Sequence, residues 1–298
     1  MKGPALVFCL LCVLVPFAPS QDDGASAGRR PAARAFEFRI EGRFDLARDG
    51  RPDSLVFEST YDFELKQGAP LPKGRVELVF RRVRVRMETP KGTGRIDTAA
   101  KPMVEGAMDP RAVDALRALV LNAVLADVDD RGLLTDMRPP KAYRGAQGGK
   151  DSALDLLAEC FPGLAAPGGG GAREQRISTD LFFVPLVFSA VERPAEAVPG
   201  AAAEAPSREE VRRRSGSVDL DRDRLDEVEA TFGAAFRKRL AALRFDDSRF
   251  ESVSRLEKPE GLPESFRAEA TWRCGLPEGE GQGEELAKGR ALFELRRR

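Results

Sequence analysis

The sequence predicts an α+β fold, namely a curved, mainly antiparallel β-sheet or open half-barrel of about nine or ten strands with three helices packed against it. Long segments alternate apolar and charged residues with a period of two, which is typical of strands that bury one face. Three other segments repeat their apolar residues every three or four positions, which is typical of amphipathic helices. Hydrophobic residues make up 42% of the 298 residues, enough to build a core.

The clearest alternation lies in the first hundred residues, over positions 36–40, 57–65 and 76–87. Each of these strands is expected to have one apolar face and one charged face. In the third segment the alternation reverses phase at Arg81-Arg82. An extra residue in one strand reverses the phase in this way, so the sequence predicts a β-bulge there.

Further strands are expected over residues 95–98, 125–128, 133–137, 177–191, 266–274 and 290–295. A hairpin turn is expected at Asp129–Gly132, between the second and third of these. The segment 177–191 contains Pro185, which cannot donate a hydrogen bond to a neighbouring strand. That segment is therefore an edge strand, a bulged strand or two separate pieces.

The three helices are expected to begin at Asp109-Pro110 and to cover residues 151–161 and about 221–243. Asp109 suits the N-cap, and Pro110 suits the first helical position because its missing N–H would have no partner there. In the third helix acidic residues crowd the first turns and basic residues the last, as the helix dipole favours.

The N-terminus has the pattern of a cleavable signal peptide over residues 1–20. Lys2 is followed by an apolar run of 11 residues, Ala5–Val15, and by small residues up to Ser20. This run is too short to span a membrane stably. The rest of the sequence contains no apolar run long enough to do so. We expect export to the periplasm or the extracellular space.

Composition divides the rest into a disordered tail at residues 21–35 and a single domain at 36–298, interrupted by a flexible loop at 193–217. Both the tail and the loop are rich in small and polar residues and lack periodicity. Cleavage would leave two cysteines, Cys160 and Cys274, and an oxidising compartment would allow them to pair. Buried thiols are the alternative.

The sequence contains no histidine, which excludes Ser-His-Asp and Cys-His catalysis and histidine-ligated metals. It carries 48 basic and 48 acidic residues. Nucleic-acid binding needs a basic excess, so nucleic acid is not expected as a partner. Glycine-rich phosphate loops and nucleophile elbows are also absent from the sequence. We therefore expect no catalytic residues, no cofactor and no enzymatic activity.

Two groups of residues are candidates for binding, and each has a structural alternative. Arg82, Arg84 and Arg86 lie on one face of a predicted strand as a basic stripe that could bind an anion. Alternatively, they pair with acidic residues on a neighbouring strand, for which Glu58, Asp62 and Glu64 are suited. The aromatic residues Phe182, Phe183, Phe188 and Trp272 could line a lipid-sized cavity or simply pack in a core.

The segment Asp127–Gly132 also resembles part of a calcium-binding loop. Positions 1, 3 and 6 of the EF-hand template match, but Arg131 and Arg138 stand where ligands are required. A hairpin turn is the better interpretation, and no metal site is expected.

The stretch from Gly74 to Thr98 (GRVELVFRRVRVRMETPKGTGRIDT) is followed by a helix, a D-D-R-G turn with LLTDM, and FPGL at Phe161–Leu164. Over roughly residues 36–190 this order resembles secreted bacterial envelope proteins of a β-rich domain-of-unknown-function family. The resemblance implies a curved sheet with helices, similar in shape to periplasmic lipoprotein carriers, and it transfers no active-site residue. The excess of Arg over Lys is typical of a high-GC bacterial sequence.

Taken together, these features predict an exported bacterial envelope protein that binds a hydrophobic ligand, such as a lipid, or a partner protein without catalysis. A purely structural or protein-interaction module with a filled core is one alternative. A carboxylate-dependent hydrolase of envelope glycans is the other, and it would need two carboxylates about 5–10 Å apart in a cleft.

Overall fold

The computed structural model describes residues 33–48, 51–67, 74–90, 92–106, 108–128, 134–146, 152–159, 174–181, 184–193, 209–257, 262–275 and 285–298. All of them belong to one compact unit, residues 31–298. The predicted signal peptide, and the predicted tail as far as residue 32, lie outside the described residues.

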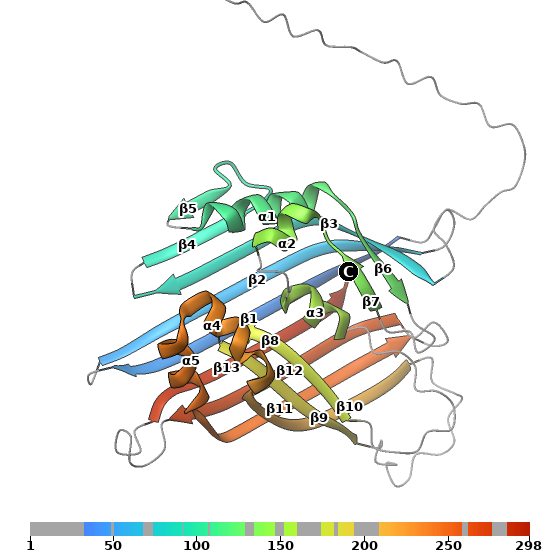
Figure 1. The fold of residues 1–298 in the computed structure, drawn as a ribbon. Coiled ribbons are helices and arrows are strands. Elements are labelled where there is room, and N and C mark those ends of the chain that lie inside the picture. Colours follow the sequence, from blue (N-terminus) through green and yellow to red (C-terminus); the bar gives the residue numbers. More distant parts are fainter. Residues whose placement is uncertain are drawn as a thin grey trace, which may run out of the picture. The chain divides into compact units, whose positions relative to one another are not determined.

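Within these described residues, thirteen strands form an open, mainly antiparallel sheet (Figure 1). The strands are β1 (Arg34–Arg48), β2 (Arg51–Gln67), β3 (Arg75–Thr89), β4 (Gly92–Asp97), β5 (Val104–Gly106), β6 (Val124–Val128), β7 (Leu134–Arg138), β8 (Glu174–Leu181), β9 (Val184–Arg193), β10 (Glu209–Leu220), β11 (Arg244–Glu257), β12 (Leu262–Gly275) and β13 (Glu285–Arg297). Their order is β5-β4-β3-β2-β1-β13-β12-β11-β10-β9-β8, and β6 pairs with β3 and β7. The last strand, β13, lies beside the first, β1.

Helices are few among the described residues. They are α1 (Pro110–Leu121), α2 (Lys141–Ala146), α3 (Ser152–Glu159), α4 (Leu225–Phe232), α5 (Ala234–Ala241) and one 3₁₀ turn, η1 (Arg222–Arg224). As predicted, Asp109 caps α1, and its carboxylate accepts a hydrogen bond from the Arg111 amide at 2.8 Å. None of the described helices combines the length and the apolar character needed to cross a membrane.

The alternation predicted for the first strands is confirmed, because Phe36, Phe38 and Ile40 of β1 are all buried. The predicted β-bulge is confirmed as well. Asp62 of β2 pairs with Arg82, whereas the next residue, Phe63, pairs with Phe80, so Arg81 is the extra residue of β3. The bulge keeps the apolar residues on both sides of it on the buried face.

Three of the described strands, namely the three-residue strand β5 and the longer strands β10 and β11, were not predicted from the sequence. β10 begins at Glu209, within the loop predicted for 193–217, so the part of that prediction covering 209–217 is wrong; residues 194–208 lie outside the described residues. The charged run Arg212-Arg213-Arg214 hides the alternation of this strand. β11 was not predicted at all, because its register shifts near Asp246 and Arg249 interrupt the period-two pattern.

Two other boundaries differ from the expectation. The segment 177–191 is two antiparallel strands, β8 and β9, with Pro185 near the start of the second. The single helix expected over 221–243 is instead η1, α4 and α5. It breaks at Gly233, whose φ of 87° is a left-handed value that favours glycine and interrupts a helix.

Candidate functional site

The inner face of the sheet is the face that carries Phe36, Phe38 and Ile40 of β1. Residues that are paired on neighbouring strands point to the same face, so their side chains form rows that cross the sheet. One row runs from Tyr61 of β2 through Phe38 and Leu295 to Phe266 of β12. These side chains are at most 5% exposed. The inner face is therefore a continuous apolar surface over at least four neighbouring strands.

Large and small side chains both occur on this face. Aromatic rings gather on β1 to β3, where Phe63 lies 5.6 Å from Phe36 and 5.4 Å from Phe80 between ring centroids. Small residues gather on β12 and β13, where Ala268, Ala270 and Ala291 face inward. The small residues allow other parts of the chain to approach the sheet closely there.

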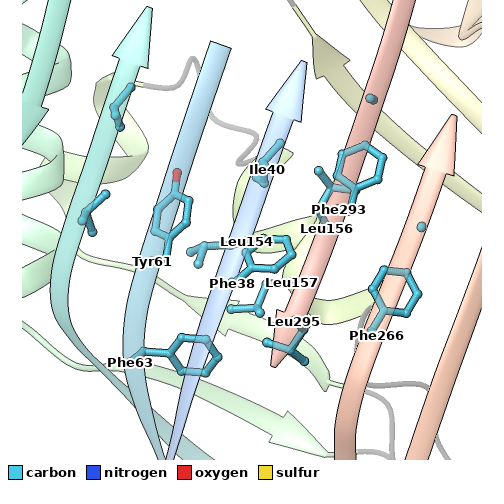
Figure 2. Packing of buried hydrophobic residues seen from close by; sticks show 14 of the residues in the cluster. Phe38, Ile40, Tyr61, Phe63, Leu154, Leu156, Leu157, Phe266, Phe293 and Leu295 are labelled. Carbon is cyan, nitrogen blue, oxygen red and sulfur yellow. The ribbon is translucent and has the colours of Figure 1, made fainter. Parts of the chain in front are cut away.

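Helix α3 covers part of the inner face. Its Leu154, Leu156 and Leu157 are at most 4% exposed and belong to the same buried cluster as Phe38 and Phe293. Figure 2 shows these leucines over β1 and β13. The cover at this point comes from a helix of eight residues, a short element that depends on packing for its stability.

Strand β9 covers another part of the inner face. The ring of Phe188 on β9 lies 5.3 Å from the ring of Phe250 on β11 and 5.6 Å from that of Phe293 on β13. Phe188 is fully buried. Of the predicted cavity-lining residues, Phe188 thus takes part in core packing, and Phe182 and Phe183 lie outside the described residues.

Trp272, the fourth of these aromatic residues, is 2% exposed on the inner face of β12. Its ring meets Phe44 edge-on at 5.3 Å and lies against Gly289 of β13. A Cβ added to Gly289 would stand 2.1 Å from Cε2 of Trp272, so only glycine fits beneath this ring. Within the described part of the chain, the buried Nε1 of Trp272 has no hydrogen-bond partner.

Cys274 lies two residues further along β12 and is also buried on the inner face. Cys160 lies outside the described residues. The disulfide between them therefore stays a prediction.

The opposite, outer face carries the predicted arginine stripe, and each arginine of the stripe has a carboxylate partner. Arg82 binds Asp97 through two hydrogen bonds, of 2.9 and 2.5 Å. Arg84 lies 3.5 Å from Asp62, and Arg86 lies 3.7 Å from Glu58. The structural alternative is thus correct for Asp62 and Glu58, whereas Glu64 pairs with Arg81 of the bulge.

Charge pairing also shifts the acidities of these outer-face carboxylates. The hydrogen bond from Arg82 is the largest influence on the pKa of Asp97 and holds it below its ordinary value. The hydrogen bond from Arg81 lowers the pKa of Glu64 in the same way. Both carboxylates are therefore ionised at neutral pH and neutralise the neighbouring arginines.

A shallow groove of about 470 Å³ lies on this outer face. Its charged lining consists of four arginines and three carboxylates, namely Arg39, Arg84, Arg86, Arg95, Glu37, Glu58 and Asp97. The excess of one positive charge is small, and Arg39, Arg84 and Arg86 each form an ion pair with a carboxylate. The groove therefore offers little net charge with which to select an anion.

The hairpin interpretation of the D-D-R-G segment is supported, because β6 and β7 pair antiparallel on either side of it. The turn itself, residues 129–133, lies outside the described residues. Asp127, the first ligand position of the rejected calcium loop, binds Arg75 at 2.9 Å and Arg138 at 2.8 Å. Among the described residues no cluster suited to a metal ion is found.

Two buried arginines were not predicted from the sequence. Arg212 and Arg214 of β10 are 4% and 6% exposed and lie on the inner face, opposite Ser254 and Ser252 of β11. Arg213, between them, is exposed on the outer face. The Val218–Leu220 alternation at the end of β10 was the only hint in the sequence that these arginines alternate between faces.

The comparisons with known proteins concern the fold. The structure is similar to lipovitellin, in a study of lipid–protein interactions, with a TM-score of 0.52 and 9% identity over 89% of this chain. The chain spans only 25% of the lipovitellin chain.

More distant matches include two proteins named for domains of unknown function. A DUF1329 protein from Desulfovibrio piger has a TM-score of 0.15, 8% identity, and coverage of 88% of this chain and 85% of its own. A β-barrel-like DUF1849 protein from Brucella abortus has a TM-score of 0.18, 11% identity, and coverage of 90% and 100%. No protein-family model matches the sequence, and neither does any curated protein. The comparisons thus show a fold shared with part of lipovitellin.

Proposed function

We propose that this protein binds a lipid or another hydrophobic ligand without catalysis, against the inner face of its open sheet. The observation that carries the proposal is the continuous apolar row from Tyr61 to Phe266, part of which is covered by the short helix α3 (Figure 2). Burial of apolar surface is the main favourable term in binding a hydrocarbon chain. The same term would drive such a ligand onto this face.

Two further observations support the proposal. The fold is shared with a quarter of lipovitellin, a protein whose structure concerns lipid–protein interactions. The inner face also combines aromatic rings with small side chains, and the small ones, Ala268, Ala270 and Ala291, lie on β12 and β13. Sites for hydrophobic ligands are lined mainly by apolar and aromatic side chains of this kind.

The proposed binding place is the part of the inner face over β1 and β13 where Leu154, Leu156 and Leu157 of α3 now pack (Figure 2). A ligand would therefore exchange with these leucines, one apolar contact replacing another. Such an exchange exposes the leucines to water, so burial of the ligand's own hydrocarbon surface has to offset that cost.

A second candidate function is a structural or protein-interaction module. The near-complete burial of the described inner face favours it, because Phe38, Phe188 and Phe293 are at most 2% exposed. In that case the inner face would be a permanently packed core, and helix α3 would not leave it to admit a ligand.

Native mass spectrometry of the full chain, produced in a bacterium and purified without detergent, tests the proposal. We expect adducts with the mass of host lipids, which disappear after delipidation and return with phospholipid vesicles. If the purified protein, the delipidated protein and the protein incubated with vesicles all have the mass of the polypeptide alone, the interaction module is favoured. The same spectrum tests the proposed export, which predicts loss of residues 1–20.

A matched pair of variants locates the binding. Ala270→Leu adds volume to the inner face of β12, where Ala270 is 1% exposed, and should reduce the adduct. Thr271→Leu adds a similar side chain to the adjacent, exposed position on the outer face and should leave it unchanged.

A further inference from the structure

The two buried arginines of β10 are charged residues on the mainly apolar inner face. A guanidinium stays charged at any physiological pH, so its burial is costly unless negative or polar groups surround it. Arg212 and Arg214 are nevertheless more than nine-tenths buried, two residues apart on one strand, with both side chains toward the apolar core. Glu192 of β9 stands opposite Arg214 in the strand register. This position places two positive charges and one acidic residue at one end of a surface that is mainly apolar toward β1.

The neighbours of the arginines are polar, and those further along the rows are apolar. Ser254 and Ser252 stand opposite Arg212 and Arg214 on β11, and both serines are at most 3% exposed. On the next strand, β12, the same two rows continue with Phe266 and Ala268. The change from cationic to hydroxyl to apolar side chains therefore takes only two strand spacings.

Beyond β12 both rows stay apolar. The first continues with Leu295 and Phe38, and the second with Phe293 and Ile40. Neighbouring strands are about 4.8 Å apart, so four spacings from β10 to β1 measure roughly 19 Å along the sheet. A surface with a charged end and a long apolar remainder matches a molecule with a charged head and a long hydrocarbon tail.

We propose that Arg212 and Arg214 form the head-group site for an anionic amphiphile, whose oxyanion they bind while its hydrocarbon tail follows the rows toward β1. This inference rests on the proposed function and adds the chemical class of the ligand. A guanidinium has five N–H donors arranged to bind carboxylate or phosphate oxygens in pairs. Both arginines already interact within the chain, and the ligand's oxygens add to those contacts.

The test compares three ligands with the same tail on the unmodified full chain, namely hexadecanoate, hexadecyl phosphate and hexadecanol. The only tryptophan of the chain, Trp272, is buried on the inner face, and its fluorescence reports binding there. We expect one or both anions to bind at least about tenfold more tightly than the alcohol, since hydrogen bonds to charged groups are strong. The anion with the higher affinity shows whether the site prefers a carboxylate or a phosphate head group.

The variants Arg212→Met and Arg214→Met keep the length of the side chain and remove its charge. Each should lower the affinity for the anion to that for the alcohol and leave the affinity for the alcohol unchanged. Arg213→Met, on the same strand but on the outer face, should keep the preference for the anion.

The outcomes separate the two proposals. Equal binding of all three ligands by the unmodified chain overturns the head-group site and leaves the proposed function standing. Binding of none of them overturns both. If the Met variants do not fold, the comparison of the three ligands on the unmodified chain still decides, because it needs no substitution.

Discussion

The ring of Phe188 on β9 meets the ring of Phe293 on β13 at 5.6 Å between centroids and at 84° between planes, although three strands separate them in the sheet. Four strand spacings in a flat sheet would put their backbones roughly 19 Å apart. The sheet therefore curls back on itself between β13 and β9. This curl makes β9 a cover for the inner face of strands in its own sheet.

The first prediction concerns this contact. Phe188→Ala and Phe293→Ala should each reduce the free energy of unfolding by about 3–5 kcal/mol, because each opens a cavity in a packed core. The double variant should lose less than the sum by about 0.5–1.5 kcal/mol, the usual coupling of an edge-to-face pair. Urea denaturation of the four proteins measures this coupling, and strictly additive losses would contradict the contact.

A second prediction concerns the close approach of Trp272 to Gly289. Gly289→Ala should destabilise the protein by about 1–3 kcal/mol, because its Cβ would overlap the indole ring at 2.1 Å. Thermal unfolding of the variant measures the loss. In a Trp272→Leu background the same alanine should cost much less, and an equal cost in both backgrounds would show that the ring is not the cause.

The third prediction concerns pH. Because the hydrogen bond from Arg82 depresses the pKa of Asp97 in the folded protein, the folded state binds fewer protons at this site than the unfolded state, whose pKa is about 3.9. The stabilisation is therefore present above that value and is lost as the pH falls through the folded pKa. Asp97→Asn should be less stable than the unmodified chain at pH 7.

The difference between the two proteins should shrink as the pH falls below about 4, because Asp97 then becomes protonated in the unmodified chain as well. The stability difference between the two proteins is measured from their denaturant midpoints at a series of pH values. A difference that does not change with pH would mean that Asp97 acts through packing rather than through charge.

The fourth prediction concerns helix α3 as the exchangeable cover. Leu157→Ala should destabilise the protein by about 2–5 kcal/mol and increase the affinity for hexadecanoate, because the helix then competes less well for the inner face. Leu119→Ala in α1 is the control, since Leu119 is equally buried but lies on a helix that packs against β3. It should lower the stability without raising the affinity. Equal affinity changes in both variants would contradict the role of α3.

Much of the first half of the sheet could be predicted from the sequence, because its strands obey a simple alternation. Even the bulge at Arg81 was visible, since a single extra residue reverses the phase of the apolar residues on β3. The cap at Asp109 was visible for a similar reason, because it depends on two adjacent residues.

The second half of the sheet was harder to predict because its strands break the pattern. On β10 the inner-face positions are filled by Arg212, Arg214 and Gly216, which look like a solvated loop in the sequence. Burial of these arginines is a property of the tertiary structure, which no local pattern contains. For the same reason the sequence could name Phe188 as an apolar residue but not its contact with Phe293.

The central claim is that a hydrophobic ligand binds on the inner face, and photo-crosslinking locates it most directly. Hexadecanoate with a diazirine in its tail would be bound to the full chain, irradiated, and mapped by mass spectrometry. The account predicts labels on inner-face residues of β1, β12 and β13, such as Phe38, Phe266 and Phe293, and on α3. Labels confined to outer-face residues such as Arg43 or Thr271, or no label at all, would contradict it.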